Sequence, residues 1–130
     1  MKLAKIINVF NTTEVLAGDP NLTHAGKWVL YSVRKQLADH SEFQREELQK
    51  LFEKYPATYN AETRELTFKS TKARDAFLEE SKKLDDLEIE INIVKQKAKL
   101  SDIPGITIQQ MEAVEDFIDF IPEPPVEPKE

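Results

Sequence analysis

The residue types that most often carry enzyme or metal chemistry are scarce in this sequence. It contains two histidines, three glycines and no cysteine. On one straight helix, the spacing between His24 and His40 puts them about 160° apart around the axis. They therefore cannot bind one metal ion within a subunit, and neither stands in a His-Glu-x-x-His motif. We predict no metal site and no cofactor.

Serine and carboxylate side chains also lack the arrangements that catalysis needs. No serine lies in a Gly-x-Ser-x-Gly turn, and the glycines form no phosphate-binding loop. Adjacent acids such as Glu46 and Glu47 point about 100° apart on a helix, so they do not share a proton. We therefore expect a protein that is not an enzyme.

Charge is distributed unevenly along the chain. The net charge is −6, and residues 102–130 hold eight acids against one base, which leaves 17 bases and 16 acids in residues 1–101. Direct binding to nucleic acid is disfavoured, because phosphates require a surplus of Lys and Arg. No segment is long and apolar enough to cross a membrane. We expect a cytoplasmic protein, in keeping with the absence of cysteine.

Hydrophobic periodicity predicts a mainly helical α+β fold, in which a long, antiparallel-packed helix accompanies a small antiparallel β-sheet and an amphipathic C-terminal helix. A short amphipathic helix is expected at 6–17 and the long helix at 20–55. Asp19 is the expected N-cap of the long helix and Pro20 its first residue.

Alternating polar and apolar residues predict the strands. They indicate a β-hairpin over 57–68 and a further strand of the same sheet over 87–94. An amphipathic helix at 70–86 is expected to cover this sheet. The sequence from Thr107 has the form of a capping box and predicts the C-terminal helix at 108–120.

We expect residues 1–121 to form one domain. Residues 122–130 hold four of the chain's seven prolines, so we predict a disordered Pro/Glu-rich tail there.

Aromatic and arginine side chains indicate a contact surface. Trp28, Tyr31 and Arg34 occupy neighbouring turns of the long helix, and these residue types dominate hot spots at protein interfaces. The more ordinary role for Trp28 is to close the core against Phe10 and Leu16 of the first helix, and contact with a partner is the alternative.

The other partner-binding candidates lie later in the chain. Phe43 is the only apolar residue between positions 39 and 47 of the long helix, where the segment is either solvated or a polar contact site. Phe117 and Phe120 either fold back onto the sheet or dock on a partner. The acidic side of the predicted C-terminal helix carries Glu112, Glu115, Asp116 and Asp119.

Five short segments carry a resemblance to a known family: IIN at 6–8, EELQKLFEKY at 46–55, EIEI at 88–91, LSDIPGI at 100–106 and MEAVE at 111–115. With their order along the chain, they resemble small uncharacterised proteins encoded by tailed phages and prophages. The resemblance implies a virus-encoded accessory protein in the host cytoplasm, and it implies no catalytic residues. The proline-rich extension after Ile121 is not part of the family's pattern.

Three functions remain open. The leading hypothesis is stoichiometric binding of a host or phage protein, for example as an inhibitor of a host defence component, by a homodimer whose second subunit covers the apolar stripes of the long helix. A second hypothesis is sequestration of a nucleotide-type defence signal. A third is an acidic phosphate mimic that inhibits a nucleic-acid-binding enzyme. The second hypothesis would use Tyr31, Arg34, Arg45, Lys95 and Lys97 as ligand contacts.

Overall fold

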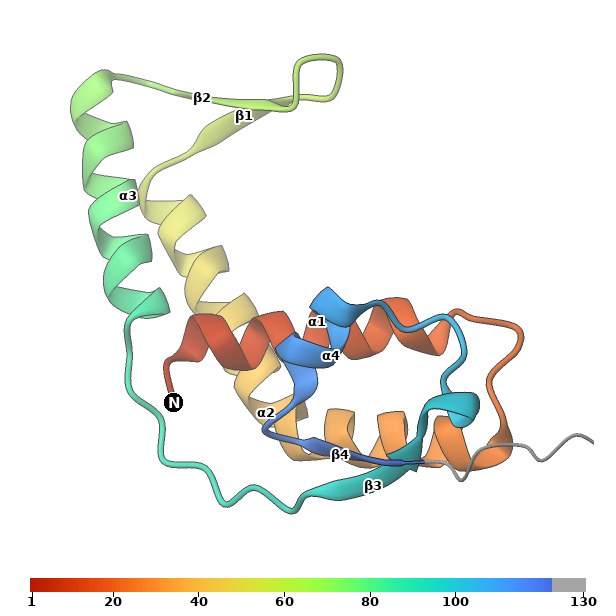
Figure 1. Ribbon diagram of the computed structural model, residues 1–130. Helices are drawn as coiled ribbons and strands as arrows, with labels where there is room; N and C mark the ends of the chain where they lie inside the picture. Colours follow the sequence, from red (N-terminus) through yellow and green to blue (C-terminus); the bar gives the residue numbers. More distant parts are fainter. Residues whose placement is uncertain (123–130) are drawn as a thin grey trace, which may run out of the picture. The chain divides into compact units, whose positions relative to one another are not determined.

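The computed structural model describes residues 1–122 and confirms a mainly helical α+β fold with one long helix (Figure 1). Part of the predicted tail, residues 123–130, lies outside the described residues. In chain order, the elements are α1 (Leu3–Ala17), α2 (His24–Lys54), β1 (Ala57–Asn60), β2 (Glu65–Phe68), α3 (Thr71–Asp85), β3 (Gln96–Lys99), the 3-10 turn η1 (Leu100–Asp102), α4 (Ile108–Val114) and β4 (Ile118–Ile121).

The chain divides into two compact units. The first consists of residues 1–7 and 39–90, and the second of residues 8–38 and the chain from Ile91 onward. Helices α1 and α2 each contribute residues to both units. The expectation of one domain over residues 1–121 stays a prediction.

The first unit contains the predicted hairpin. Strands β1 and β2 pair antiparallel, with Tyr59 opposite Leu66. The Asn60 side chain accepts the N–H of Glu62 at 2.9 Å within the turn, and Arg64 has a left-handed φ of 57°. These are ordinary turn devices, since asparagine side chains cap turns. The hairpin prediction is confirmed.

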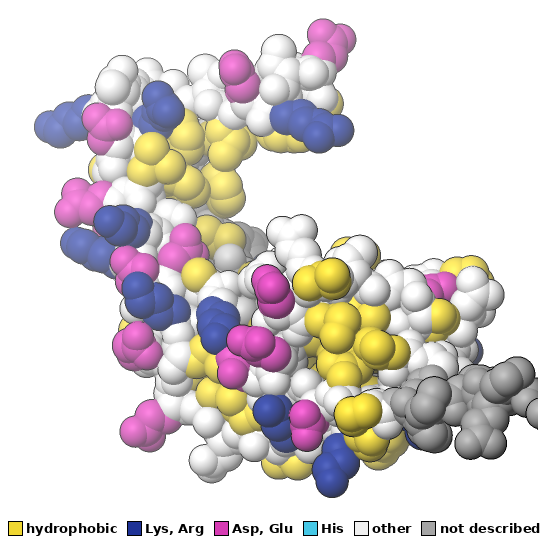
Figure 2. All heavy atoms as spheres, viewed as in Figure 1, with side chains coloured by type: hydrophobic (Ala, Val, Ile, Leu, Met, Phe, Trp, Pro, Cys, Tyr) yellow, Lys and Arg dark blue, Asp and Glu magenta, His cyan; other side chains and the backbone are white. Residues whose placement is uncertain are grey.

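The hairpin has one apolar face because its side chains alternate. At the base of this face three phenylalanine rings form a cluster. The ring centroid of Phe77 lies 5.1 Å from that of Phe68 and 4.9 Å from that of Phe52. Figure 2 shows hydrophobic side chains along the hairpin where it meets α3, at the top of the view. Nearer the turn, Tyr59 and Leu66 remain exposed. Helix α3 therefore covers only the base of the hairpin.

Helix α3 begins at Thr71, one residue after the predicted start at 70. The Ser70 hydroxyl accepts the N–H of Ala73 at 3.1 Å and so caps the helix. Further along α3, the Glu80 carboxylate forms an ion pair with the ammonium group of Lys54 in α2, at a distance of 3.0 Å.

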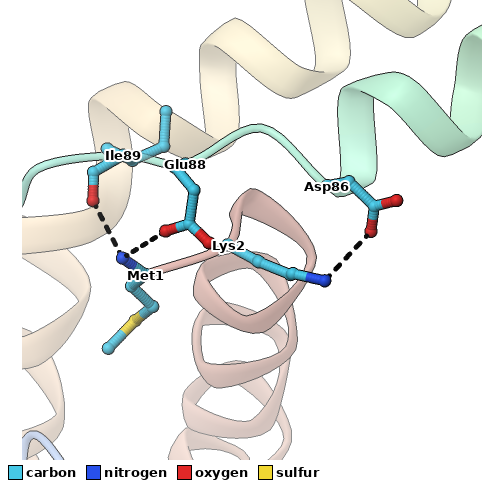
Figure 3. A network of polar contacts seen from close by, with 5 residues as sticks. All are labelled: Met1, Lys2, Asp86, Glu88 and Ile89. Atoms are coloured by element: carbon cyan, nitrogen blue, oxygen red, sulfur yellow. Dashed lines mark hydrogen bonds and ion pairs between the residues drawn. The ribbon is translucent and has the colours of Figure 1, made fainter.

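The strand predicted at 87–94 is wrong. Among residues 1–122, its only ladder contact is an isolated bridge between Lys2 and Glu88. The Met1 amine donates to the Ile89 carbonyl at 3.0 Å and lies 3.2 Å from the Glu88 carboxylate, while Lys2 lies 3.5 Å from Asp86 (Figure 3). The alternation indicated an extended segment, but the pairing with residues 1–3 stops at this single bridge, because the chain enters helix α1 at Leu3.

The second unit holds the larger core. Helix α1 contributes Val9 and Leu16, together with Thr13, whose buried hydroxyl donates to the Phe10 carbonyl at 2.6 Å. The other buried residues are Leu22, Gly26, Val29, Leu30, Val33 and Leu37 of the α2 region, and Ala98, Ile103, Val114, Phe117 and Ile118 of the C-terminal region.

A parallel pair of strands completes this unit and was not predicted. Strands β3 and β4 run side by side in the same direction, with Gln96 opposite Ile118 and Lys97 opposite Asp119 (Figure 1). Ala98 is buried, whereas Lys97 and Lys99 are exposed. The lysines thus stay in water, because the inward positions of this strand are even-numbered.

The predicted long helix starts too early. Helix α2 begins at His24, and the Thr23 hydroxyl, not Asp19, accepts an N–H of its first turn, that of Gly26, at 3.0 Å. Asp19 instead accepts the N–H of Asn21 at 2.9 Å and that of Gly105 at 3.1 Å. Its carboxylate is therefore used by a local turn and by a remote loop.

The C-terminal helix starts at Ile108, as predicted, but it ends before the predicted end at residue 120. Thr107 and Gln110 form the capping box, with bonds of 2.9 and 3.1 Å. The helix ends at Val114, and residues 118–121 form β4. The prediction of helix through 120 is wrong, because Ile118, Phe120 and Ile121 have high β-propensity and β3 offers them a pairing edge.

Candidate protein-binding surface

Two aromatic rings stand in water on α2. Trp28 is 63% exposed and Tyr31 is 56% exposed, and their ring centroids are 5.8 Å apart. The prediction that Trp28 closes the core is wrong, because its side chain is mostly in water while Leu30, two residues on, is buried at 1% exposure. At 100° per residue, Trp28 and Tyr31 lie on the side of the helix opposite the stripe formed by Gly26, Val29, Leu30, Val33 and Leu37.

Single exposed apolar side chains are ordinary, whereas exposed aromatic rings grouped together indicate a contact surface. Each ring buries a large apolar area when a partner covers it. Trp and Tyr are also the types most enriched at binding hot spots. The pair on α2 is therefore the strongest candidate for a binding surface in residues 1–122.

A pocket of about 480 Å³ lies on one side of the Tyr31 ring and is here called the Phe10 pocket. Its apolar lining comes from α1, α2 and the loop that joins them. Three of the lining residues are cations, and none of the lining residues is an acid. The lining consists of Phe10, Ala17, Leu22, Lys27, Leu30, Tyr31, Arg34, Lys35 and Ala38.

Arg34 is oriented by an aromatic neighbour. Its guanidinium lies over the Phe10 ring, 4.9 Å from the ring centroid. Such a cation–π contact limits the rotamers of the arginine and leaves N–H donors for another group. Arg34 is therefore a positioned cation at the pocket.

A second pocket of about 410 Å³, the Val94 pocket, lies on the other side of Tyr31 and Lys35. Its wall is held by Gln36, whose amide donates to the Val94 carbonyl at 3.0 Å and accepts the Val94 N–H at 2.9 Å. The lining consists of Trp28, Tyr31, Ser32, Lys35, Gln36, Val94 and Gln96.

The two pockets share Tyr31 and Lys35 as a common ridge. We call the set Lys27, Trp28, Tyr31, Arg34 and Lys35 the aromatic-basic face. All five residues belong to α2 and to the second unit.

The remaining predicted site residues lie elsewhere. Phe43, 40% exposed, and Arg45 belong to the part of α2 in the first unit. Phe117 is fully buried, so it folds back and does not present its ring to a partner. Phe120 is partly covered within β4. Lys95 is exposed and lines neither the Phe10 pocket nor the Val94 pocket.

The predicted acidic arc depends on a helix that the structure does not continue. Glu112 lies in α4, Glu115 and Asp116 follow its end, and Asp119 lies in β4 opposite Lys97. Glu112, Glu115 and Asp119 are exposed. Because the helix ends at Val114, these carboxylates do not form one helical stripe.

Lys27 and Lys35 are functional candidates that the sequence reasoning missed. Both lie about one helical turn from Tyr31. A helical wheel of α2 would have placed them beside Tyr31, away from the buried stripe. The contribution of Val94 had no such signal, because it depends on a hydrogen bond to a residue 58 positions away.

In residues 1–122, no three His, Asp or Glu side chains are grouped in a way that could hold a metal ion. Within the same residues, no helix combines the length and the apolar character that crossing a bilayer requires.

Comparisons with known proteins found no match: no family model matches the chain, and neither a curated protein nor a solved structure matches it.

Proposed function

We propose that this protein acts by stoichiometric binding of a protein partner, and that it does so through the aromatic-basic face. The observation that supports this function is the exposed Trp28–Tyr31 pair, on the side of α2 opposite the buried stripe and flanked by two pockets. An aromatic anchor beside an apolar pocket, with cations at the edge, is the usual anatomy of an interface.

The wider setting rests on the resemblance to phage and prophage proteins. In that setting the protein is a cytoplasmic accessory protein, and its partner is a host or phage protein, for example a host defence component. A homodimer remains part of this proposal, and light scattering after gel filtration measures it.

Affinity capture tests the binding function. The wild-type chain and a Trp28→Ala/Tyr31→Ala variant are immobilised and exposed to a lysate of the host. We expect one protein in near-stoichiometric amount on the wild type and a loss of about thirtyfold or more in its affinity for the double variant, because removal of a hot spot costs about 2 kcal/mol or more.

The matched control is Tyr59→Ala, which removes an equally exposed ring, 59% exposed, from the hairpin of the first unit. We expect this variant to retain the partner. Equal loss from both variants, or equal retention by both, would contradict the assignment of binding to the aromatic-basic face.

A second candidate function is sequestration of an anionic nucleotide-type ligand, and the cationic lining of the Phe10 pocket favours it. The pocket volume lies in the range of small-molecule sites. Tyr31 and Arg34 line it as that hypothesis expects, with Lys27 and Lys35 in place of Arg45, Lys95 and Lys97.

Thermal-shift measurements separate the two functions. A sequestered nucleotide must raise the Tm as its concentration rises, because it binds only the folded chain. The protein-binding function predicts no shift with cyclic nucleotides or ADP-ribose derivatives. A concentration-dependent shift that Arg34→Ala abolishes would favour the ligand function.

A further inference from the structure

The charged side chains that line the Phe10 pocket are positive, whereas the net charge of the whole chain is negative. The chain carries −6, yet the charged residues that line this pocket are Lys27, Arg34 and Lys35. The carboxylates nearby in the sequence, those of Glu14, Asp19 and Asp39, do not line it. The pocket is therefore a local basic site on an acidic protein.

The cations are spaced along the helix axis. Lys27 and Arg34 are seven residues apart, which is about 10 Å along α2. Two carboxylates that are two turns apart on a partner helix have the same spacing. A helix lying along α2 could therefore pair with both cations at once.

The floor of the pocket is apolar and has room. Leu22 and Leu30 of its lining are buried, while Ala17 and Ala38 are small and leave space for a larger side chain. An apolar partner side chain that enters here would be covered by Phe10 and Tyr31. Grooves of this kind bind the apolar face of an amphipathic helix.

We infer that the occupant of the Phe10 pocket is a short amphipathic helix of the partner, with apolar residues on one face and carboxylates along its edges. This inference rests on the proposed function. Charge complementarity selects an acidic helix over a basic one, because opposite charges at an interface suppress wrong partners and speed encounter.

Trp28 is the only tryptophan of the chain, and its ring centroid lies 5.8 Å from that of Tyr31, which lines the Phe10 pocket. Its fluorescence therefore reports on an occupant that covers Tyr31. The probes are three sets of helical peptides. In every set, the same positions on one face of the helix are filled at random with apolar residues. The positions that flank this face are Glu in the first set, Gln in the second and Lys in the third. We expect the Glu set to change Trp28 emission at the lowest concentration, the Gln set to bind about tenfold more weakly, and the Lys set not to bind. Binding of the Glu set should weaken as salt is added.

Charge reversal provides the matched test. We expect Arg34→Glu/Lys35→Glu to lose the Glu set by about tenfold or more and to gain binding of the Lys set. The control is Lys82→Glu/Lys83→Glu in α3, which changes the net charge equally but alters the first unit. That control should bind the three sets as the wild type does.

Three results would overturn the inference. If the Gln and Glu sets bind equally, the partner is not selected by charge, although the docking function stands. If no set changes Trp28 emission while the captured host protein still binds through Trp28 and Tyr31, the occupant is not such a helix. If Arg34→Glu/Lys35→Glu converts a dimer to a monomer, a second copy of the chain is the occupant.

Discussion

Gly26 is the position where one added methyl group has the most predictable effect. It lies in the first turn of α2, and a Cβ there would lie 2.1 Å from the Asp102 carbonyl oxygen and 2.9 Å from its carbon. Real atoms do not approach so closely, and both obstacles are backbone atoms. Gly26→Ala must therefore push η1 away from α2.

The cost can be worked out from the bonds that this movement breaks. Thr23 donates its N–H to the Asp102 carbonyl at 3.3 Å and its hydroxyl to the Asp102 carboxylate at 2.8 Å. The first bond contributes about 1 kcal/mol and the charged one about 1.5–3 kcal/mol. Alanine returns about 1 kcal/mol through its higher helix propensity. The net loss is about 2 kcal/mol, or about 6–10 °C in Tm.

Urea unfolding followed by circular dichroism measures this loss. The control is Gly18→Ala, where the added Cβ is in ordinary contact, 3.4 Å from the Val15 carbonyl oxygen. We expect the control to match the wild type within about 0.5 kcal/mol. A Gly26→Ala protein as stable as the wild type would refute the close approach of α2 and η1.

Four other substitutions have expected outcomes. Phe77→Ala should destabilise the protein by about 3–4 kcal/mol in urea unfolding, because it removes the buried ring between two other phenylalanines. Ile118→Ala should cost about 2–4 kcal/mol in the same assay, and Ile121→Ala less than about 1 kcal/mol, because the first side chain is 2% exposed and the second 40%. Glu80→Gln should remove a stability increment that depends on pH. The hydrogen bond from Lys54 lowers the pKa of Glu80 below its ordinary 4.5, and the same bond raises the pKa of Lys54 above its ordinary 10.5. The increment is therefore present from about pH 4.5 to 10.5, and it is lost as pH falls through the folded pKa of Glu80 or rises through that of Lys54.

Each of these predictions has a control or a result that would contradict it. Leu78→Ala, on the exposed side of α3, should be nearly neutral, and a loss equal to that of Phe77→Ala would contradict the aromatic cluster. Equal losses for the two isoleucines would contradict the register of β4. If the difference in free energy of unfolding between the wild type and Glu80→Gln is the same at pH 3 and at pH 7, the ion pair with Lys54 is not the source of the pH dependence.

Local signals predicted the elements whose stability is local. The Ser70 cap, the hairpin turn at Asn60 and the Thr107 capping box all involve residues within a few positions of one another. The partners of these bonds are therefore near neighbours in the sequence. For the same reason, the helix starts at 71 and 108 agree with the sequence-based expectation to within one residue.

The candidate site was predicted only in part. Tyr31 and Arg34 were identified from residue type and spacing, and both line the Phe10 pocket. The exposure of Trp28 was not predicted, because its residue type favoured a place in the core although its position on α2 is opposite the buried stripe. The cations Lys27 and Lys35 became candidates only when the buried side of α2 was known.

The sequence by itself determined the hairpin, the two capped helices and the mainly helical α+β class, since periodicity and capping act between near neighbours. Only the tertiary structure decided that residues 118–121 leave the helix to pair with 96–99, and that residues 87–94 do not join a sheet. Strand pairing requires an available edge, and where that edge lies depends on residues far away in the chain. The same long-range packing buries Leu30 and leaves Trp28 in water, and so it creates the surface on which the proposed function rests.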